Sequence, residues 1–411
     1  MRERAACLSW SVALAVLPLG HVTGLRNGLV LLAIAVTLVA FPPHWKRIPG
    51  LAAFVALLAW ALASCAWSVN PDASWSKWRS DLLLPFLAYV AVFGWSRAAG
   101  EASARCIIGA LLAGLAIVSI LSAFAFLPAM PLDEFLDFRP YPGVVRDMPQ
   151  WYPGPQDASF FAVMALVPIL TWRERNPRPG RVAMAGFAMS AFIVAVALNR
   201  IVLAGIVATV LAYAWFRDPR SRVGRDGISL GSATLGWARA AVVALTVAVA
   251  IFATLEIFSR ERLGANAAPI PAWGGAAREL VAHDPRLAIW AHYFELGAVR
   301  PLTGHGYGRT VPAMASVVQP YEYSHAHNFF FDLWLELGLV GVAIFLALLY
   351  ALLREALRAA GDTPQSRVEF AGLVALITAM LVRNMSDDLF VYGMAVLFWA
   401  LAGSFLGRQR A

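Results

Sequence analysis

Residues 325–353 read HAHNFFFDLWLELGLVGVAIFLALLYALL. The second half, 338–353, holds no charged side chain, and an uncharged apolar run of this kind is typical of a membrane span. The first half has an apolar face at helical spacing, made of Phe330, Leu333, Trp334 and Leu337, and a polar face made of Asn328, Asp332 and Glu336. The stretch therefore predicts an interfacial amphipathic helix that leads into a membrane span.

The rest of the chain has the same apolar character. Of its 411 residues 60% are hydrophobic and only 14% are charged, and the mean hydropathy is +0.66. These proportions exclude a soluble globular protein, which needs more polar surface. Twelve apolar runs are candidate spans: 5–20, 28–42, 49–68, 82–96, 106–127, 158–172, 182–199, 201–216, 238–257, 338–353, 368–382 and 389–406. We predict an all-α integral membrane protein with about twelve transmembrane helices.

The distribution of charge predicts the orientation. With twelve spans both termini lie on one side, and that side receives 20 of the 33 Lys and Arg residues and 8 of the 25 acidic residues. The opposite side receives the other 13 basic and 17 acidic residues, so the two sides carry +12 and −4. By the positive-inside rule both termini are cytoplasmic. The net charge of +8 thus reflects topology, and nucleic-acid binding is not expected.

Three parts of the chain follow from these runs. Residues 1–257 form spans one to nine, with an outer loop at 128–157; residues 258–337 form a large outer loop with amphipathic helices; residues 338–411 form the last three spans. A cleaved signal peptide at the N-terminus is the less favoured reading, because no small-x-small site precedes His21. The three cysteines, Cys7, Cys65 and Cys106, show no disulfide or metal spacing and are expected to be core thiols.

Two arginines occupy unusual positions. Asp284 and Pro285 predict a helix start, with an apolar stripe at Leu287, Trp290, Ala291, Phe294 and Ala298. Arg286 lies in its first turn, where the helix dipole favours anions, so a bound phosphate would compensate the charge. Arg200 lies between two apolar runs at the outer surface, where a guanidinium needs a partner. The alternative for Arg286 is a solvated surface residue.

Two histidines, His325 and His327, precede the amphipathic helix quoted above. The positive end of the helix dipole lowers an imidazole pKa, which keeps the ring neutral as a general base requires. A metal site is the weaker alternative, because i, i+2 spacing is not a helical chelating pair and no compact acidic set accompanies it; a structural pair is a further alternative. The segment Gly304-His305-Gly306-Tyr307-Gly308 is either a ligand-binding loop or a tight turn.

Other outer polar residues are candidates for contacting a phosphate or a sugar. Lys77 and Arg79 accompany Trp75 and Trp78, an arrangement suited to the lipid headgroup level. We assign substrate binding to Lys77, Arg79, Arg139, Arg146, Tyr152, His325 and Asn328. The carboxylates of Asp387 and Asp388 could hold a divalent ion, but pairing with Arg383 and helix capping explain them more simply.

Several of these segments together resemble the O-antigen ligase/polymerase superfamily. The resemblance rests on residues 199–205, on DPRLAIW at 284–290, on the glycine turn 304–308 and above all on HAHNFFFDLWLELGLVG at 325–341. It implies a GT-C-like membrane fold, with a large periplasmic helical loop between the ninth and tenth spans, in the bacterial inner membrane. Size and loop layout are more similar to the ligases than to the polymerases.

The resemblance also implies a reaction and its residues. Such ligases transfer O-antigen from undecaprenyl diphosphate to the lipid A-core oligosaccharide at the periplasmic face. His327 matches the family base, and Arg200 and Arg286 match two arginines expected to bind the carrier diphosphate. This chain has Leu198-Asn199 before Arg200, where the family usually has Ser or Thr. The expected enzyme is an inverting glycosyltransferase that needs no metal or cofactor, acts as a monomer and contacts membrane lipids.

Three alternatives to glycan ligation stay open. Polymerisation of carrier-linked repeats and glycan transfer to a protein use the same donor chemistry, so the sequence separates them poorly from ligation. A non-enzymatic lipid or glycan transporter should show repeat symmetry and charged residues at midplane depth. This chain instead collects its polar residues at one predicted face.

Overall fold

The computed structural model describes residues 1–126, 152–175, 180–197, 200–217, 285–308, 326, 328–361, 363–385 and 392–410. Within these ranges the chain forms helices joined by turns and no strand, as the all-α class requires. The helices are α1 (Arg2–Val16), α2 (Thr23–Ala40), α3 (Leu51–Ser64), α4 (Pro71–Lys77), α5 (Leu84–Ala99), α6 (Glu101–Phe126), α8 (Pro155–Arg175), α9 (Gly180–Ala197), α10 (Arg200–Arg217), α13 (Pro285–Val299), α15 (Phe329–Ala359), α16 (Pro364–Asn384) and α17 (Tyr392–Arg408). Short 3-10 turns lie at η1 (Trp45–Arg47) and η2 (Cys65–Trp67), and a π-helical turn, η3 (Trp78–Leu83), joins α4 to α5.

The predicted apolar runs coincide with these helices wherever the structure describes them, and the ninth run, 238–257, lies outside the described residues. In the part of the chain that the structure describes, five helical segments are long and apolar enough to cross a membrane: Thr23–Ala40, Pro71–Ala99, Glu101–Ala125, Phe329–Ala359 and Pro364–Asn384. Shorter apolar helices accompany them. The structure is thus consistent with a membrane protein, while the number of twelve spans stays a prediction.

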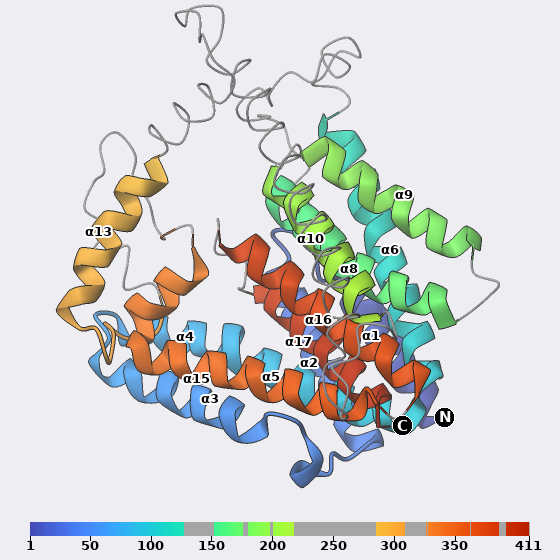
Figure 1. Ribbon diagram of the computed structural model, residues 1–411, viewed down its shortest axis with the longest axis horizontal. Coiled ribbons are helices and arrows are strands. Elements are labelled where there is room, and N and C mark those ends of the chain that lie inside the picture. Colours follow the sequence, from blue (N-terminus) through green and yellow to red (C-terminus); the bar gives the residue numbers. More distant parts are fainter. Residues whose placement is uncertain are drawn as a thin grey trace, which may run out of the picture.

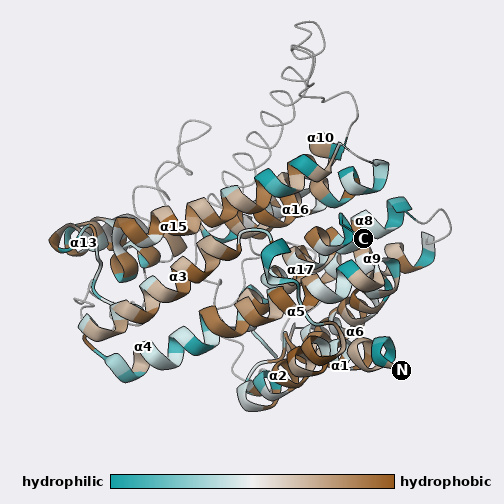
Figure 2. Ribbon diagram, turned by 90° about the horizontal axis from the view of Figure 1, so that it is seen from below, coloured by the Kyte–Doolittle hydropathy of each residue, from teal (hydrophilic) through white to brown (hydrophobic). Residues whose placement is uncertain are grey.

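The helical bundle has two ends, one rich in polar residues and one that carries the predicted site (Figure 1; Figure 2). Both termini lie at one end of the molecule, and α13 with the start of α15 lies at the other (Figure 1). Apolar residues run along the helices between these ends, and hydrophilic residues gather near the C-terminus (Figure 2). Helix ends that the charge pattern places on the cytoplasmic side therefore share one end of the structure.

Buried charges join four helices at the end with the termini. Glu369 of α16 accepts hydrogen bonds from Arg408 of α17, at 3.0 Å from Nε and 2.8 Å from Nη2. Arg175 of α8 pairs with Glu369 and also with Glu101 of α6. Because the Glu369 side chain is 2% exposed, its charge is stable there only with such partners. The cluster fixes the relative positions of α6, α8, α16 and α17.

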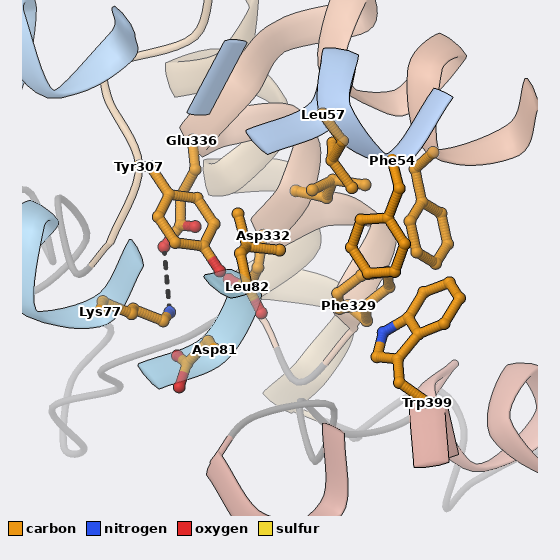
Figure 3. Close-up of a pocket in the computed structure, with 12 residues that line it drawn as sticks. Phe54, Leu57, Lys77, Asp81, Leu82, Tyr307, Phe329, Asp332, Glu336 and Trp399 are labelled. Carbon is orange, nitrogen blue, oxygen red and sulfur yellow. Dashed lines mark hydrogen bonds and ion pairs between the residues drawn. The ribbon is translucent and has the colours of Figure 1, made fainter. Parts of the chain in front are cut away.

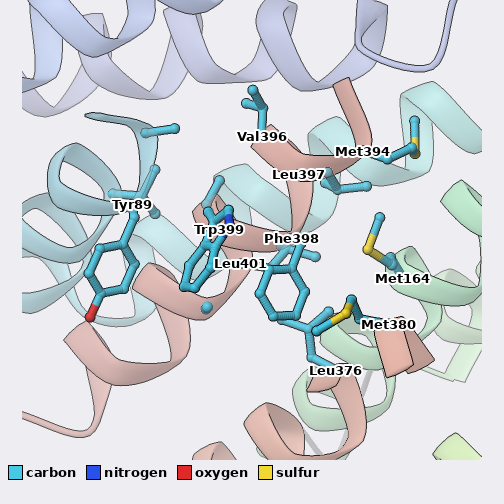
Figure 4. Packing of buried hydrophobic residues seen from close by; sticks show 14 of the residues in the cluster. Tyr89, Met164, Leu376, Met380, Met394, Val396, Leu397, Phe398, Trp399 and Leu401 are labelled. Atoms are coloured by element: carbon cyan, nitrogen blue, oxygen red, sulfur yellow. The ribbon is translucent and has the colours of Figure 1, made fainter. Parts of the chain in front are cut away.

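The centre of the bundle is packed tightly where α17 meets α5. A Cβ added at Gly403 would come 2.6 Å from the carbonyl oxygen of Tyr89, and one at Gly407 would come 2.6 Å from that of Phe93. Glycines four residues apart allow two membrane helices to approach this closely. The large side chains on either side, including Tyr89, Trp399 and Phe398, interlock in the core (Figure 4).

The expectation of unpaired core cysteines was wrong for two of the three. Cys7 of α1 and Cys106 of α6 form a disulfide, with their Cα atoms 5.6 Å apart. Spacing along the chain does not show this pairing, because 99 residues separate the two positions and the contact depends on how α1 packs against α6. Cys65 is a half-buried free thiol.

Candidate functional site

Helix α15 contains a kink that separates the predicted interfacial helix from the predicted span. Gly338 has φ 68° and ψ −175°, a conformation available in practice only to glycine. Backbone N–H and C=O groups near the kink lose their hydrogen-bond partners within the helix. The turn at residues 301–306 supplies new partners for them. The carbonyls of Leu335 and Glu336 accept from the N–H groups of His305 (2.8 Å) and Gly306 (3.0 Å). The N–H groups beyond the kink, at 339 and 340, donate to the carbonyls of residues 301 and 302.

The glycine turn at 304–308 also contacts the neighbouring helices. The N–H of Tyr307 donates to Ser64 Oγ at 2.9 Å, at the end of α3. The Nε2 of His305 lies 3.0 Å from the carbonyl of Leu296 in α13, so this nitrogen carries the hydrogen and donates. A Cβ at Gly304 would overlap the backbone of Glu336. The described contacts show a tight turn that joins α3, α13 and α15, and Tyr307 of the same segment lines the cavity described next.

A small cavity with a mainly apolar lining and four charged residues lies where this turn, η3 and α15 meet (Figure 3). Its charged lining comes from Lys77, Asp81, Asp332 and Glu336, and its apolar lining includes Phe54, Leu57, Leu82, Phe329, Phe345 and Trp399. The volume of about 30 Å³ is enough for about two water molecules. In this state the cavity can hold solvent around the buried charges.

Lys77 and Glu336 form an ion pair at this cavity. Lys77 Nζ lies 3.2 Å from Glu336 Oε1, and the two side chains are 17% and 7% exposed. The ammonium also lies 5.7 Å from the centre of the Tyr307 ring. The pairing brings the predicted headgroup-level segment, α4, against the predicted interfacial helix. An anion that enters here would compete with Glu336 for Lys77.

The polar face of the first part of α15 is buried inside the protein. Asp332 and Glu336 are each 5% exposed, so this side of the predicted interfacial helix packs against the protein. Asp332 Oδ1 accepts from the N–H of Ala326 at 2.9 Å. Burial, with the nearby carboxylates of Asp332 and Glu336, raises the pKa of Tyr293 in α13, which keeps its hydroxyl protonated.

The turn that precedes α15 is fixed from three directions. Asn328 caps the helix, because its Oδ1 accepts from the N–H groups of Phe330 (3.0 Å) and Phe331 (3.3 Å). Its Nδ2 donates to the carbonyl of Met385 at the end of α16, at 3.1 Å. The indole Nε1 of Trp290, in α13, donates to the carbonyl of Ala326 at 2.9 Å. The two residues that flank His327 are thereby tied to α13, α15 and α16.

Helix α13 begins at Pro285 as the sequence predicts, but its buried face differs from the predicted stripe. Ile289 and Tyr293 are 1% and 2% exposed, whereas Phe294 is 59% exposed. The reason is Gly297, which follows them at helical spacing and lets the helix approach Trp334 so closely that a Cβ would come 2.8 Å from its ring. The predicted stripe positions Ala291 and Ala298 are exposed as well.

The predicted site residues fall into two groups. His325, His327, Arg139 and Arg146 lie outside the described residues, and for Arg200 and Arg286 the structure describes only their place at the start of α10 and in the first turn of α13. A Cβ added at Gly205 of α10 would come 4.0 Å from the side chain of Val382 in α16. The start of α10 therefore runs beside the end of α16.

The remaining predicted residues are described and differ in their surroundings. Lys77 lines the cavity. Arg79 is exposed and lies over the Trp75 ring at 5.4 Å, and Tyr152 is 5% exposed with its carbonyl against Gly20. Neither of these two is among the residues that line the cavity. The polar atoms of Asn328 are engaged in capping, as described above.

Three buried acidic residues at the cavity were not among the site residues predicted from the sequence. Asp81, Asp332 and Glu336 carry charges into the protein interior, where a charge is costly unless it has a role or a partner. The available signal was the i, i+4 spacing of Asp332 and Glu336 within an apolar helix, and the place of Asp81 immediately before an apolar run. Among the described residues no cluster of three or more metal-binding side chains occurs.

One family model matches part of the chain. Residues 184–346 match the family described as O-antigen ligase, and this segment includes Arg200, Arg286, His327 and the kinked part of α15. The match supports a member of the O-antigen ligase/polymerase superfamily, a group of glycosyltransferase-like proteins, and the apolar helices are consistent with a multi-pass membrane protein. No curated protein matches the chain.

Proposed function

We propose that this protein is an O-antigen ligase that transfers glycan from undecaprenyl diphosphate to lipid A-core oligosaccharide at the periplasmic face of the inner membrane. The observation that carries the proposal is the tie between α13 and the turn before α15: the Trp290 indole donates to Ala326, the residue next to His327. It links the helix that carries Arg286 in its first turn to the segment that bears the proposed base, and both lie inside the matched family segment.

The reaction needs a base and a site for negative charge. His327 removes the proton from the acceptor hydroxyl as its oxygen forms a bond to the anomeric carbon of the donor glycan. The bond between that carbon and the diphosphate oxygen breaks, and the electron pair leaves with the diphosphate. Arg200 and Arg286 stabilise the charge that develops there, so the step requires no metal ion. Direct displacement inverts the anomeric centre.

Further residues are proposed to bind the substrates. Lys77, Arg79, Arg139, Arg146, Tyr152, His325 and Asn328 are assigned to the carrier headgroup and the glycans. For Lys77 the structure supports a specific role, because the diphosphate would displace Glu336 from the ammonium with which it pairs at 3.2 Å. Asn328 contributes through the helix cap that it provides.

Replacing either arginine should weaken the reaction at the donor. We expect Arg286→Ala and Arg200→Ala each to lower kcat/KM for the carrier-linked donor by about 100-fold, because a charge-assisted contact to the leaving group is lost. Lysine at either position should restore part of the activity, since it keeps the charge without the bidentate geometry. The assay is turnover of a purified donor in proteoliposomes, with the substrate concentration varied.

Arg300 provides the matched control for these variants. It is an exposed arginine immediately after α13, at the far end of the helix from Arg286. Arg300→Ala should keep the wild-type kcat/KM. Wild-type kinetics in the Arg286 and Arg200 variants, or an equal loss in the Arg300 variant, would count against a diphosphate site at these positions.

A further inference from the structure

The backbone N–H and C=O of Ala326 are both held by side chains from other parts of the structure. Its N–H donates to Asp332 Oδ1 at 2.9 Å, and its carbonyl accepts from Trp290 Nε1 at 2.9 Å. Ala326 is 0% exposed, so water does not replace these bonds. Each bond to a buried peptide is costly to lose, because the polar atom left behind has no other solvation.

The two side chains are themselves fixed. The Trp290 ring stacks on Phe331, with centroids 5.8 Å apart and planes 24° apart. Asp332 is 5% exposed and lies one turn into α15, which Asn328 caps. A clamp built from such rigid parts holds a peptide in one orientation, and the next residue along the chain inherits that orientation at its Cα.

We infer that Trp290 and Asp332 are positioning residues for His327, acting through the peptide of Ala326. The inference rests on the proposed function, in which His327 is the base. Because Trp290 is in the second turn of the helix that begins at Pro285, the same indole also links that helix to the turn that bears the proposed base. Neither residue is assigned a contact with the reacting atoms.

The test compares Trp290→Phe with Trp334→Phe. Phenylalanine at 290 keeps a ring against Phe331 but removes the indole N–H. Trp334 provides the control, because its Nε1 donates to the carbonyl of Pro301 at 3.1 Å in the same corner between α13 and α15, without contacting Ala326. We expect Trp290→Phe to lower kcat about tenfold with the donor KM within about twofold of wild type, the pattern of a misplaced catalytic group. Trp334→Phe should keep the wild-type kcat.

A second pair of variants separates positioning from structure at Asp332. Asp332→Asn keeps an oxygen acceptor for the Ala326 N–H and should retain kcat within about threefold, whereas Asp332→Leu removes the acceptor and should lose about tenfold. Hydrogen–deuterium exchange of the peptide that contains Ala326 gives a readout without activity. Exchange should be faster in Trp290→Phe and Asp332→Leu than in wild type and in Trp334→Phe.

The outcomes separate this inference from the proposed function. Wild-type exchange in both Trp290→Phe and Asp332→Leu would overturn the clamp whatever the activity. Equal losses of kcat in Trp290→Phe and Trp334→Phe would also overturn it, because they would show a general structural effect. If the wild-type protein transfers no glycan, the proposed function fails. Faster exchange in Trp290→Phe and Asp332→Leu would still support the clamp in that case.

Discussion

His327→Ala is expected to abolish detectable glycan transfer, with a fall in kcat of at least about 1000-fold. The imidazole is proposed to take the proton of the acceptor hydroxyl, and loss of a positioned general base typically costs between about 100-fold and 10,000-fold. Alanine leaves the capping side chain of Asn328 and the bonds of Ala326 unchanged. The variant should therefore insert into membranes and bind the carrier lipid as wild type does.

The measurement is single-turnover transfer from a labelled carrier-linked glycan, with carrier binding measured separately. The control is His44→Ala, since His44 is exposed beside η1 at a turn that the charge pattern places on the cytoplasmic side. That variant should keep wild-type activity. Transfer at the wild-type rate by His327→Ala would remove the base assignment.

Gly338→Ala is expected to prevent stable folding of the end of the molecule that carries the site. The position has φ 68°, and an added Cβ would overlap the carbonyl of Leu302 in the backbone of the adjacent turn. Backbone strain of this kind costs about 3 kcal/mol, and the overlap adds to it, because backbone atoms cannot move aside as a flexible side chain can. The loss should appear as a lower unfolding temperature in detergent and as low recovery of protein.

Gly109→Ala is the matched control. Gly109 lies within α6 with no atom within 4 Å of an added Cβ, so alanine there should leave stability unchanged or raise it slightly. An unfolding temperature for Gly338→Ala equal to that of wild type would contradict the docking of residues 301–306 onto the kink.

The sequence predicts the helices well because apolar runs and their interruptions are local signals. The run at 338–353 became the second part of α15, and the glycine at its start became the kink. The partners of the kink could not be predicted, since the turn that pairs with it lies more than 30 residues away in the chain and meets it only after α13 packs. The same limit applies to Cys7 and Cys106, which pair across two helices.

The buried charges of the site show a second limit of prediction from sequence. Asp332 and Glu336 lie on the polar side of an amphipathic pattern, which ordinarily faces water. The protein instead covers that side with Lys77 and the peptide of Ala326. Periodicity identifies which residues share a face, but it does not tell whether solvent or a second polar element covers the face. In α13 one small residue, Gly297, shifted the buried face away from the apolar stripe.

The most direct test of the central claim is the identity of the acceptor. Purified protein in proteoliposomes is given a labelled glycan on undecaprenyl diphosphate, with lipid A-core, carrier-linked repeats and a periplasmic protein mixture as competing acceptors and a chelator in the buffer. Mass spectrometry then finds which molecule carries the label. The account predicts labelled lipid A-core, formed in the presence of the chelator and absent with His327→Ala. Label on lengthened carrier-linked glycan or on protein, with none on lipid A-core, would contradict it.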